Sequence, residues 1–111
     1  MDCIFCKIAA GQSPGDMVYE DDKVVVFRDI NPVAPVHVLI IPREHIASLN
    51  DITEQQTPLI GHMIMVAKQV AKQQDIAEKG YRVVFNVGSW GGQLIQHLHM
   101  HLLGGRKLRF Q

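Results

Sequence analysis

The sequence predicts an α+β domain in which an antiparallel sheet carries helices packed against it. Three observations lead to this fold class: short runs rich in β-branched residues that end at turn formers, one segment with the apolar period of an amphipathic helix, and histidines that alternate with apolar residues near the C-terminus. In chain order, the elements are a helix, three strands, a helix and two strands. With 111 residues, the chain is expected to form one domain over residues 1–111.

A short helix comes first in this order. Asp2 can cap it, and Gly11 can end it in a conformation that glycine favours. Three runs rich in β-branched or aromatic residues follow as predicted strands: residues 17–20, 23–27 and 37–41. Two aspartates form the turn between the first two strands, prolines interrupt the chain before the third, and Pro42 stops it.

The second helix is amphipathic. Between residues 59 and 70, apolar side chains recur at spacings of four, three and four, which places them on one helix face. Two signals compete for its start. Thr53 with Gln56 forms a capping box, whereas Thr57 followed by Pro58 fits a cap and a first helical position better.

The histidine run forms the last predicted strand, after a fourth strand at residues 81–85 and a glycine-rich loop at 86–92. His97, His99 and His101 are three of the chain's six histidines, and they alternate strictly with apolar residues. Because residues two apart share one face of a strand, this pattern aligns the imidazoles on a polar face and turns the apolar residues to the core. A row of imidazoles suits metal binding, or proton and phosphoryl chemistry near neutral pH.

Composition excludes several classes of protein. Eleven basic residues balance eleven acidic ones, which argues against a general nucleic-acid coat or a membrane-surface protein. The N-terminus has neither a basic region nor a long apolar run, so we expect no signal peptide and no transmembrane segment. Two cysteines are too few for a disulfide scaffold, and a reduced, cytoplasmic protein is expected.

Three functions could use the histidine face: zinc-dependent hydrolysis, nucleophilic attack by an imidazole on phosphorus, and binding without chemistry. The loop at residues 88–93 favours the second. Its glycines allow backbone N–H groups to turn toward an anion, and it leads directly into the histidines. One short segment therefore combines expected phosphate donors with a candidate nucleophile.

These residues resemble the histidine triad (HIT) family. The run His97-Leu98-His99-Met100-His101-Leu102-Leu103 matches its signature of three alternating histidines followed by two apolar residues. The neighbouring Gly91-Gly92-Gln93 and Gly104-Gly105-Arg106 resemble its histidine triad nucleotide-binding branch, also called protein kinase C inhibitor-like. The resemblance extends over nearly the whole chain through further segments: residues 4–8, 19–22, 27–30, 34–37, 41–45 and 80–82.

The resemblance implies a five-stranded antiparallel sheet with two helices and a homodimer whose sheets join into ten strands. It also implies a hydrolase of purine nucleoside phosphoramidates, such as adenosine 5′-monophosphoramidate, that binds an AMP- or GMP-type nucleotide and needs no metal for catalysis. His99 would be the nucleophile that forms a nucleotidyl-histidine, flanked by His101 and His37. The remaining nucleotide-binding positions would be Ile8, Phe27, Ile30 and Leu39 for the base, Asp29 for the ribose, and Asn86, Gly92, Gln93 and the backbone N–H of Leu94 for the phosphate.

Two alternatives to this function stay open. One is hydrolysis of dinucleoside polyphosphates, the activity of a sister branch with the same triad. The other is a nucleotide- or zinc-binding interaction protein without physiological turnover. The uridylyltransferase branch is excluded, because it carries proline where this chain has Leu98.

The resemblance implies three further features. Cys3 and Cys6 have metal-ligand spacing, and some relatives bind a structural zinc with such a pair and histidines that match His45 and His97. Phe110 falls where relatives carry an aromatic residue that reaches the partner's site. Leu94 stands where the branch usually has serine, so a side-chain hydrogen bond to the phosphate or the leaving group is missing here.

Overall fold

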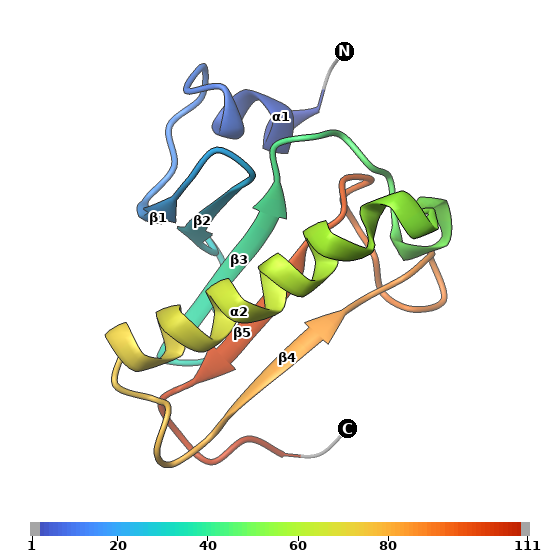
Figure 1. Ribbon diagram of the computed structural model, residues 1–111. Coiled ribbons are helices and arrows are strands. Elements are labelled where there is room, and N and C mark those ends of the chain that lie inside the picture. Colours follow the sequence, from blue (N-terminus) through green and yellow to red (C-terminus); the bar gives the residue numbers. More distant parts are fainter. Residues whose placement is uncertain (1–2, 110–111) are drawn as a thin grey trace.

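The computed structural model describes residues 3–109 and confirms the predicted order of elements (Figure 1). The helices and strands are α1 (Ile4–Ala9), β1 (Met17–Glu20), β2 (Val24–Arg28), β3 (Val36–Pro42), α2 (Thr57–Gln73), β4 (Tyr81–Phe85) and β5 (Met100–Gly104), with single 3₁₀ turns at Leu49–Asp51 and Glu54–Gln56. Asp2 and Phe110, for which we predicted a helix cap and a contact with the partner, lie outside the described residues.

The five strands form one antiparallel sheet in the order β1-β2-β3-β5-β4, as predicted. The last strand of the chain therefore lies between β3 and β4. In this register, Leu39 on β3 lies opposite His101, and Val84 on β4 lies opposite His101 from the other side. The topology thus places the end of the histidine run inside the sheet, next to the edge strand β4.

The two helices pack on different faces of the sheet. One core cluster joins α2 to alternate strand residues: Val24, Val26, Val38, Ile40, Met100 and Leu102. The other joins α1 to the intervening ones: Val25, Phe27, Leu39 and Ile41. Figure 1 shows α2 running across one face, whereas α1 lies beside the ends of β2 and β3. Because successive strand residues point to opposite faces, β2 and β3 are buried on both sides.

Several predicted boundaries were wrong by one to three residues. Cys3, not Asp2, is the residue at the N-cap of α1, where its sulfur accepts the N–H of Cys6. Pro42 lies within β3 opposite Val24, so it ends the strand one residue later than expected. Both start signals of the second helix are used. The Thr53 N–H donates to Gln56 Oε1 over a 3₁₀ turn, and α2 then begins at Thr57.

The largest correction concerns the histidine run. The strand begins only at Met100, so His97 and His99 precede it. Neither is solvated on a polar face, since both side chains are buried. The alternation itself is confirmed, because Leu98, Met100 and Leu102 all pack in the α2 cluster while the histidines point to the other face. Among residues 3–109, no helix is long and apolar enough to cross a membrane.

Candidate active site

A cleft of about 1550 Å³ opens on the sheet face opposite α2, next to α1. It gathers residues from both ends of the chain, because α1, β2, β3, β4, β5 and the loop before the histidines all contribute to its wall. The predicted site residues that line it are Ile8, Phe27, Asp29, Ile30, His37, Leu39, Asn86, Gly92, Leu94, His99 and His101. All the predicted catalytic and nucleotide-binding residues except Gln93 therefore border one cavity.

The hydrogen bonds of His99 define its tautomer. Its Nδ1 lies 2.7 Å from the backbone oxygen of His97. A carbonyl oxygen can only accept, so Nδ1 carries a proton, and in the neutral form of the ring Nε2 keeps its lone pair. The ring packs edge-on against Phe5, with centroids 5.2 Å apart, and it lines the cleft. This arrangement presents an unprotonated imidazole nitrogen in a fixed orientation, as a nucleophile requires.

His37 and His101 form a second directed pair. The Val33 N–H donates to His37 Nδ1 at 3.1 Å, so the proton of this imidazole is on Nε2. That Nε2 lies 2.9 Å from His101 Nδ1 and 3.3 Å from Asp29 Oδ2. His101 Nδ1 accordingly accepts, and His101 carries its own proton on Nε2. The chain of donors runs from Val33 through His37 to His101, which stands next to His99 with ring centroids 5.0 Å apart.

Both members of this pair are neutral imidazoles near pH 7. Burial lowers the pKa of His37, although the Asp29 carboxylate opposes the shift. Burial also lowers the pKa of His101 to about 4, with the neighbouring His99 and His37 adding to the effect. An anionic ligand in the cleft would act in the opposite direction, because a negative charge favours the protonated imidazole.

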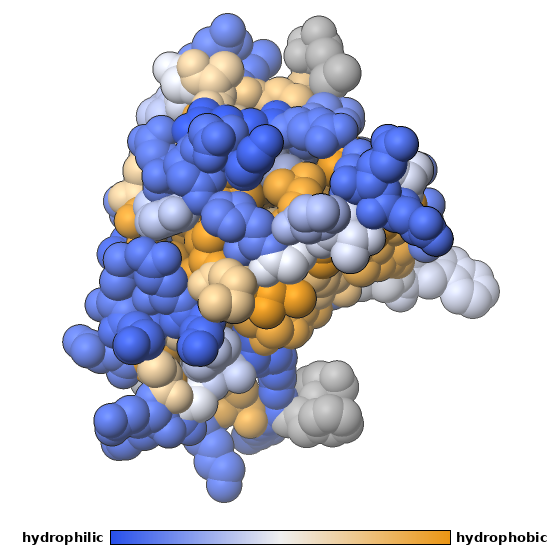
Figure 2. Space-filling view, viewed as in Figure 1, coloured by the Kyte–Doolittle hydropathy of each residue, from blue (hydrophilic) through white to orange (hydrophobic). Residues whose placement is uncertain are grey.

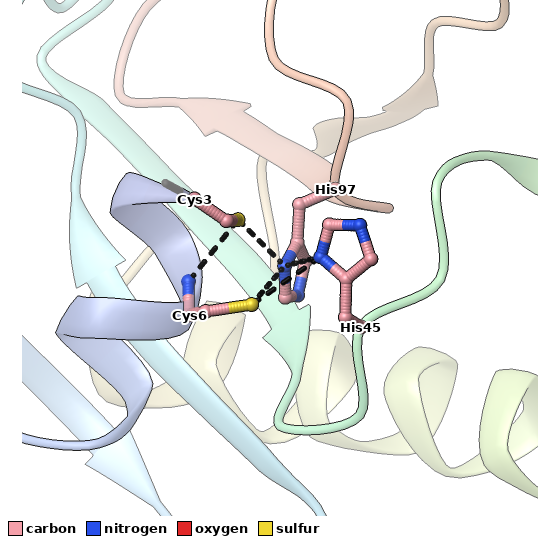
Figure 3. A group of neighbouring side chains, drawn as sticks. All are labelled: Cys3, Cys6, His45 and His97. Atoms are coloured by element: carbon pink, nitrogen blue, oxygen red, sulfur yellow. Dashed lines mark hydrogen bonds between the residues drawn. The ribbon is translucent and has the colours of Figure 1, made fainter. Parts of the chain in front are cut away.

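A separate cluster of cysteine and histidine side chains lies at the N-terminal end of α1 (Figure 3). Cys3 caps α1 and Cys6 belongs to it, whereas His45 comes from the segment after β3 and His97 from the segment before β5. His97 Nδ1 lies 3.3 Å from Cys3 Sγ, and the Nδ1 atoms of His45 and His97 are 3.2 Å apart. Cys6 Sγ lies 3.3 Å from His45 Nδ1 and 3.5 Å from His97 Nδ1.

These distances fit a tetrahedral zinc site. With zinc–sulfur bonds of about 2.3 Å and zinc–nitrogen bonds of about 2.05 Å, a regular tetrahedron has edges of about 3.3 Å between nitrogens and about 3.6 Å between nitrogen and sulfur. His97 Nε2 lies 2.8 Å from the carbonyl oxygen of Pro42 and is therefore protonated, which leaves the Nδ1 lone pair for a metal. Burial lowers the pKa of His97 and keeps its ring neutral.

The histidine and carboxylate group in the cleft differs from this cluster in one decisive contact. Asp29, His37 and His101 also bring possible ligand atoms within 4.8 Å of one another. However, the Val33 N–H occupies His37 Nδ1 and leaves the proton on Nε2, the nitrogen that faces the other two residues. A metal would have to displace that proton. The hydrogen-bond partners therefore favour metal binding in the cysteine cluster and proton transfer in the cleft.

The loop before the histidines differs from the anion-binding turn that we predicted. The N–H groups of Gly91 and Gln93 both donate to the Gly88 carbonyl, and the Gly92 N–H donates to Ser89. These donors close the loop on itself. Gly91 is required there, because a Cβ at this position would lie 2.2 Å from the Val87 carbonyl oxygen.

The side chain of Gln93 is bonded to the backbone of the protein. Its side chain is only 5% exposed and does not line the cleft. Its Oε1 accepts the Gly88 N–H, and its Nε2 donates to the carbonyl oxygens of Ala47 and Ile95. Backbone groups therefore occupy both polar atoms of the Gln93 side chain, at a position that we expected to contact phosphate. Gln93 therefore braces the loop, and Leu94, which is 89% exposed, borders the cleft beside it.

Sequence reasoning missed two residues that support the site. Phe5 packs edge-on against Phe27, His97 and His99, with ring centroids 5.4, 5.9 and 5.2 Å apart. Arg43 donates to the carbonyl oxygens of Ala9 and Asp21 and so ties the end of α1 to the β1–β2 turn. Alternation along the strands gives no signal for either contact, because both depend on how α1 docks on the sheet.

Comparisons with known proteins agree with this geometry. The family model described as "Scavenger mRNA decapping enzyme C-term binding" matches residues 2–108. The purine nucleoside phosphoramidase of Escherichia coli K12 is 50% identical over 105 residues, which are 95% of this chain and 88% of that protein. A 14 kDa zinc-binding protein of Zea mays is 48% identical over 109 residues, 96% of this chain and 84% of that one.

A solved structure whose name places it in the histidine triad family has the same fold. The HIT family hydrolase from Legionella pneumophila Philadelphia 1 superimposes with a TM-score of 0.97 at 48% identity, covering 98% of this chain and 97% of that one. Identity at this level over whole chains reaches far beyond the short signature that first raised the resemblance. The protein therefore belongs to the histidine triad family.

Proposed function

We propose that this protein hydrolyses purine nucleoside phosphoramidates through a nucleotidyl-histidine on His99. The observation that carries the proposal is the bond from His99 Nδ1 to the His97 carbonyl, which leaves a nucleophilic Nε2 in a cleft of nucleotide size. The similarity to the E. coli purine nucleoside phosphoramidase supports the choice of substrate, with 50% identity over 95% of the chain.

In the first step, the lone pair of His99 Nε2 attacks phosphorus and forms a P–N bond to the imidazole while the P–N bond to the leaving amine breaks. The leaving nitrogen needs one proton. The His37–His101 pair takes up this proton when the anionic phosphate enters the cleft, and His101 Nε2 delivers it. The covalent His99 then carries one positive charge, shared over its ring and the bond to the His97 carbonyl.

In the second step, water attacks the nucleotidyl-histidine. His101, now neutral, accepts a proton from that water, and the bond between phosphorus and His99 Nε2 breaks with its electron pair returning to the imidazole. The nucleoside monophosphate leaves, and the His37–His101 pair again holds the proton that it gave to the leaving amine in the first step. No step in this sequence requires a metal ion.

The remaining cleft residues account for nucleotide binding. Phe27 and Leu39 are buried side chains that form an apolar wall for the base, together with Ile8. Asp29 accepts the Asn31 N–H with one oxygen and faces His37 with the other. It can therefore accept a hydrogen bond from a ribose hydroxyl and also orient the His37–His101 pair. Ile30 is 90% exposed at the rim and can close over a bound base.

The test compares AMP release from a tryptamine phosphoramidate of AMP and from a diadenosine polyphosphate, measured side by side. We expect the phosphoramidate to react faster, and His99→Ala to lower its turnover by roughly 10³-fold or more while nucleotide binding persists. His62→Ala is the matched control, because His62 contacts Asp21 outside the cleft, at 2.7 Å, and should leave turnover unchanged. Faster release from the dinucleotide would favour the sister activity, and a tenth of wild-type turnover in His99→Ala would disprove the covalent mechanism.

We also propose that Cys3, Cys6, His45 and His97 hold a structural zinc. Four protein ligands would complete its coordination and leave no position for substrate. What supports this site is its tetrahedral spacing, the protonated Nε2 of His97 and the similarity to a zinc-binding protein of maize.

A homodimer is the third part of the proposal. β4 lies at one end of the strand order, where a second copy could continue the sheet. Exposed apolar residues lie on β4 and on α2: Tyr81, Val83, Ile64 and Met65. Figure 2 shows apolar surface on the side of α2 that faces β4. Light scattering at micromolar concentration should give about twice the 12.5 kDa of one chain, and a 12.5 kDa species would refute the dimer.

A further inference from the structure

The Gly104-Gly105-Arg106 segment, which the proposed function does not use, contacts the loop between β2 and β3. Arg106 Nη2 donates to the Val33 carbonyl oxygen at 2.8 Å, and Nη1 donates to the carbonyl oxygen of Lys107 at 3.1 Å. Gly105 has a φ of +94°, and a Cβ there would lie 2.8 Å from Pro35 Cβ. The segment after β5 thus packs closely on this loop at two points.

Val33 connects this contact to the histidine pair. Its carbonyl accepts from Arg106, and its N–H donates to His37 Nδ1. The latter bond occupies His37 Nδ1 and so places the proton on Nε2, where the Asp29 carboxylate at 3.3 Å also favours it, and this sets the direction of the bond from His37 Nε2 to His101. The side chain of Val33 is 64% exposed, so packing of the side chain does little to hold this residue in place.

We propose that Arg106 is a positioning residue for the histidine pair: by holding the Val33 carbonyl, it keeps the Val33 N–H on His37 Nδ1 and so keeps the Nε2 proton of His37 directed at His101. The inference rests on the proposed function for its effect on turnover, but not for its effect on the tautomer of His37. Arg106 does not line the cleft, so it acts through Val33 and not on substrate.

The loop has a second, independent anchor on its other side. The Asp29 N–H donates to the His37 carbonyl at 2.9 Å, and Asp29 Oδ1 accepts the Asn31 N–H at 2.8 Å. Loss of the Arg106 contact should therefore release Val33 while Asp29 stays in place. Because Asp29 is the proposed ribose contact, kcat should fall and KM should change little.

The experiment follows the ¹⁵N signals of His37 and the hydrogen exchange of the Val33 amide in wild type, Arg106→Gln and Arg106→Lys. Lys107→Gln is the matched control, since it removes the same charge from the exposed neighbouring residue and keeps the carbonyl that Arg106 contacts. Wild type should show an unprotonated Nδ1 and a protonated Nε2. Arg106→Gln should show both tautomers, faster Val33 exchange, and kcat lower by about tenfold at a KM within about twofold.

Arg106→Lys should show a smaller change than Arg106→Gln in each of these measurements, because an ammonium can still donate to one carbonyl. Gly105→Ala should reproduce the tautomer mixture by pushing on Pro35. An unchanged His37 spectrum in Arg106→Gln would overturn the inference, as would an equal effect of Lys107→Gln. If wild-type protein failed to turn over phosphoramidates, the proposed function would fall, and the spectra would still decide the role of Arg106.

Discussion

Replacing Gln93 by glutamate should destabilise the protein although the two side chains have nearly the same shape. Glutamate keeps an oxygen for the Gly88 N–H, but it has no N–H for the carbonyls of Ala47 and Ile95. Two partly buried carbonyl oxygens then lose this partner, and a carboxylate oxygen faces them. At about 1–3 kcal/mol for each unsatisfied group, the free energy of unfolding should fall by roughly 2–6 kcal/mol.

The assay is urea unfolding at pH 7 and fixed protein concentration, with hydrogen exchange of the loop amides as a local measure. Leu94→Ser is the neighbouring control, since an 89% exposed side chain contributes little to stability. A direct phosphate contact through Gln93 predicts the opposite outcome: unchanged unfolding and a raised KM. A Gln93→Glu variant as stable as wild type would therefore refute the role of this residue as a brace.

Three further predictions concern the leaving group, the metal and pH. Leu94→Ser should raise phosphoramidate turnover by about tenfold by supplying a hydrogen bond to the phosphate or leaving group. An unchanged turnover would mean that Leu94 has no influence on the rate, and a lower turnover would mean that its packing favours the reaction. Protein purified without chelator should contain one zinc per chain, and elemental analysis showing well under one zinc would contradict the site. Removal of the zinc should lower Tm by roughly 10 °C, since a ligand at a hundred times its Kd contributes about 2.7 kcal/mol to the free energy of unfolding. Because the pKa of His101 is lowered to about 4 in the folded chain, from about 6.5 unfolded, its contribution to stability is complete above pH 6.5 and is lost as the pH falls toward 4. The urea midpoint should fall across this window, less so in His101→Asn, and a midpoint that stays constant would show that the shift is absent.

Local patterns were enough to predict the elements and the faces that they present. The period of 3.6 in α2 and the period of 2 around the histidines follow from backbone geometry, so Leu98, Met100 and Leu102 were correctly assigned to the core side. The Cys3–Cys6 spacing likewise predicted two sulfurs that are close together, because about one helical turn separates them.

The sequence did not indicate which partners the polar groups of the loop before the histidines would take. The glycine-rich loop was expected to turn its amides outward, yet Gly88 and Ser89 accept them. Gln93 was assigned to phosphate because of its position in the motif, and the backbone of Ala47, 46 residues away, takes its amide instead. A sequence pattern indicates which groups can donate or accept, but not which of them will lie within 3 Å.

The sequence by itself therefore determined the family, the order of elements and several of the residues that border the cleft, His37, His99 and His101 among them. Only the tertiary structure assigned a proton to each imidazole, because the deciding partners are backbone groups: the His97 carbonyl for His99, the Pro42 carbonyl for His97 and the Val33 N–H for His37. The three rings are chemically alike, and neither their order nor their spacing distinguishes a metal ligand from a nucleophile or a proton donor. That distinction arises when β3 and β5 pair and the loop before β3 is held against the end of β5.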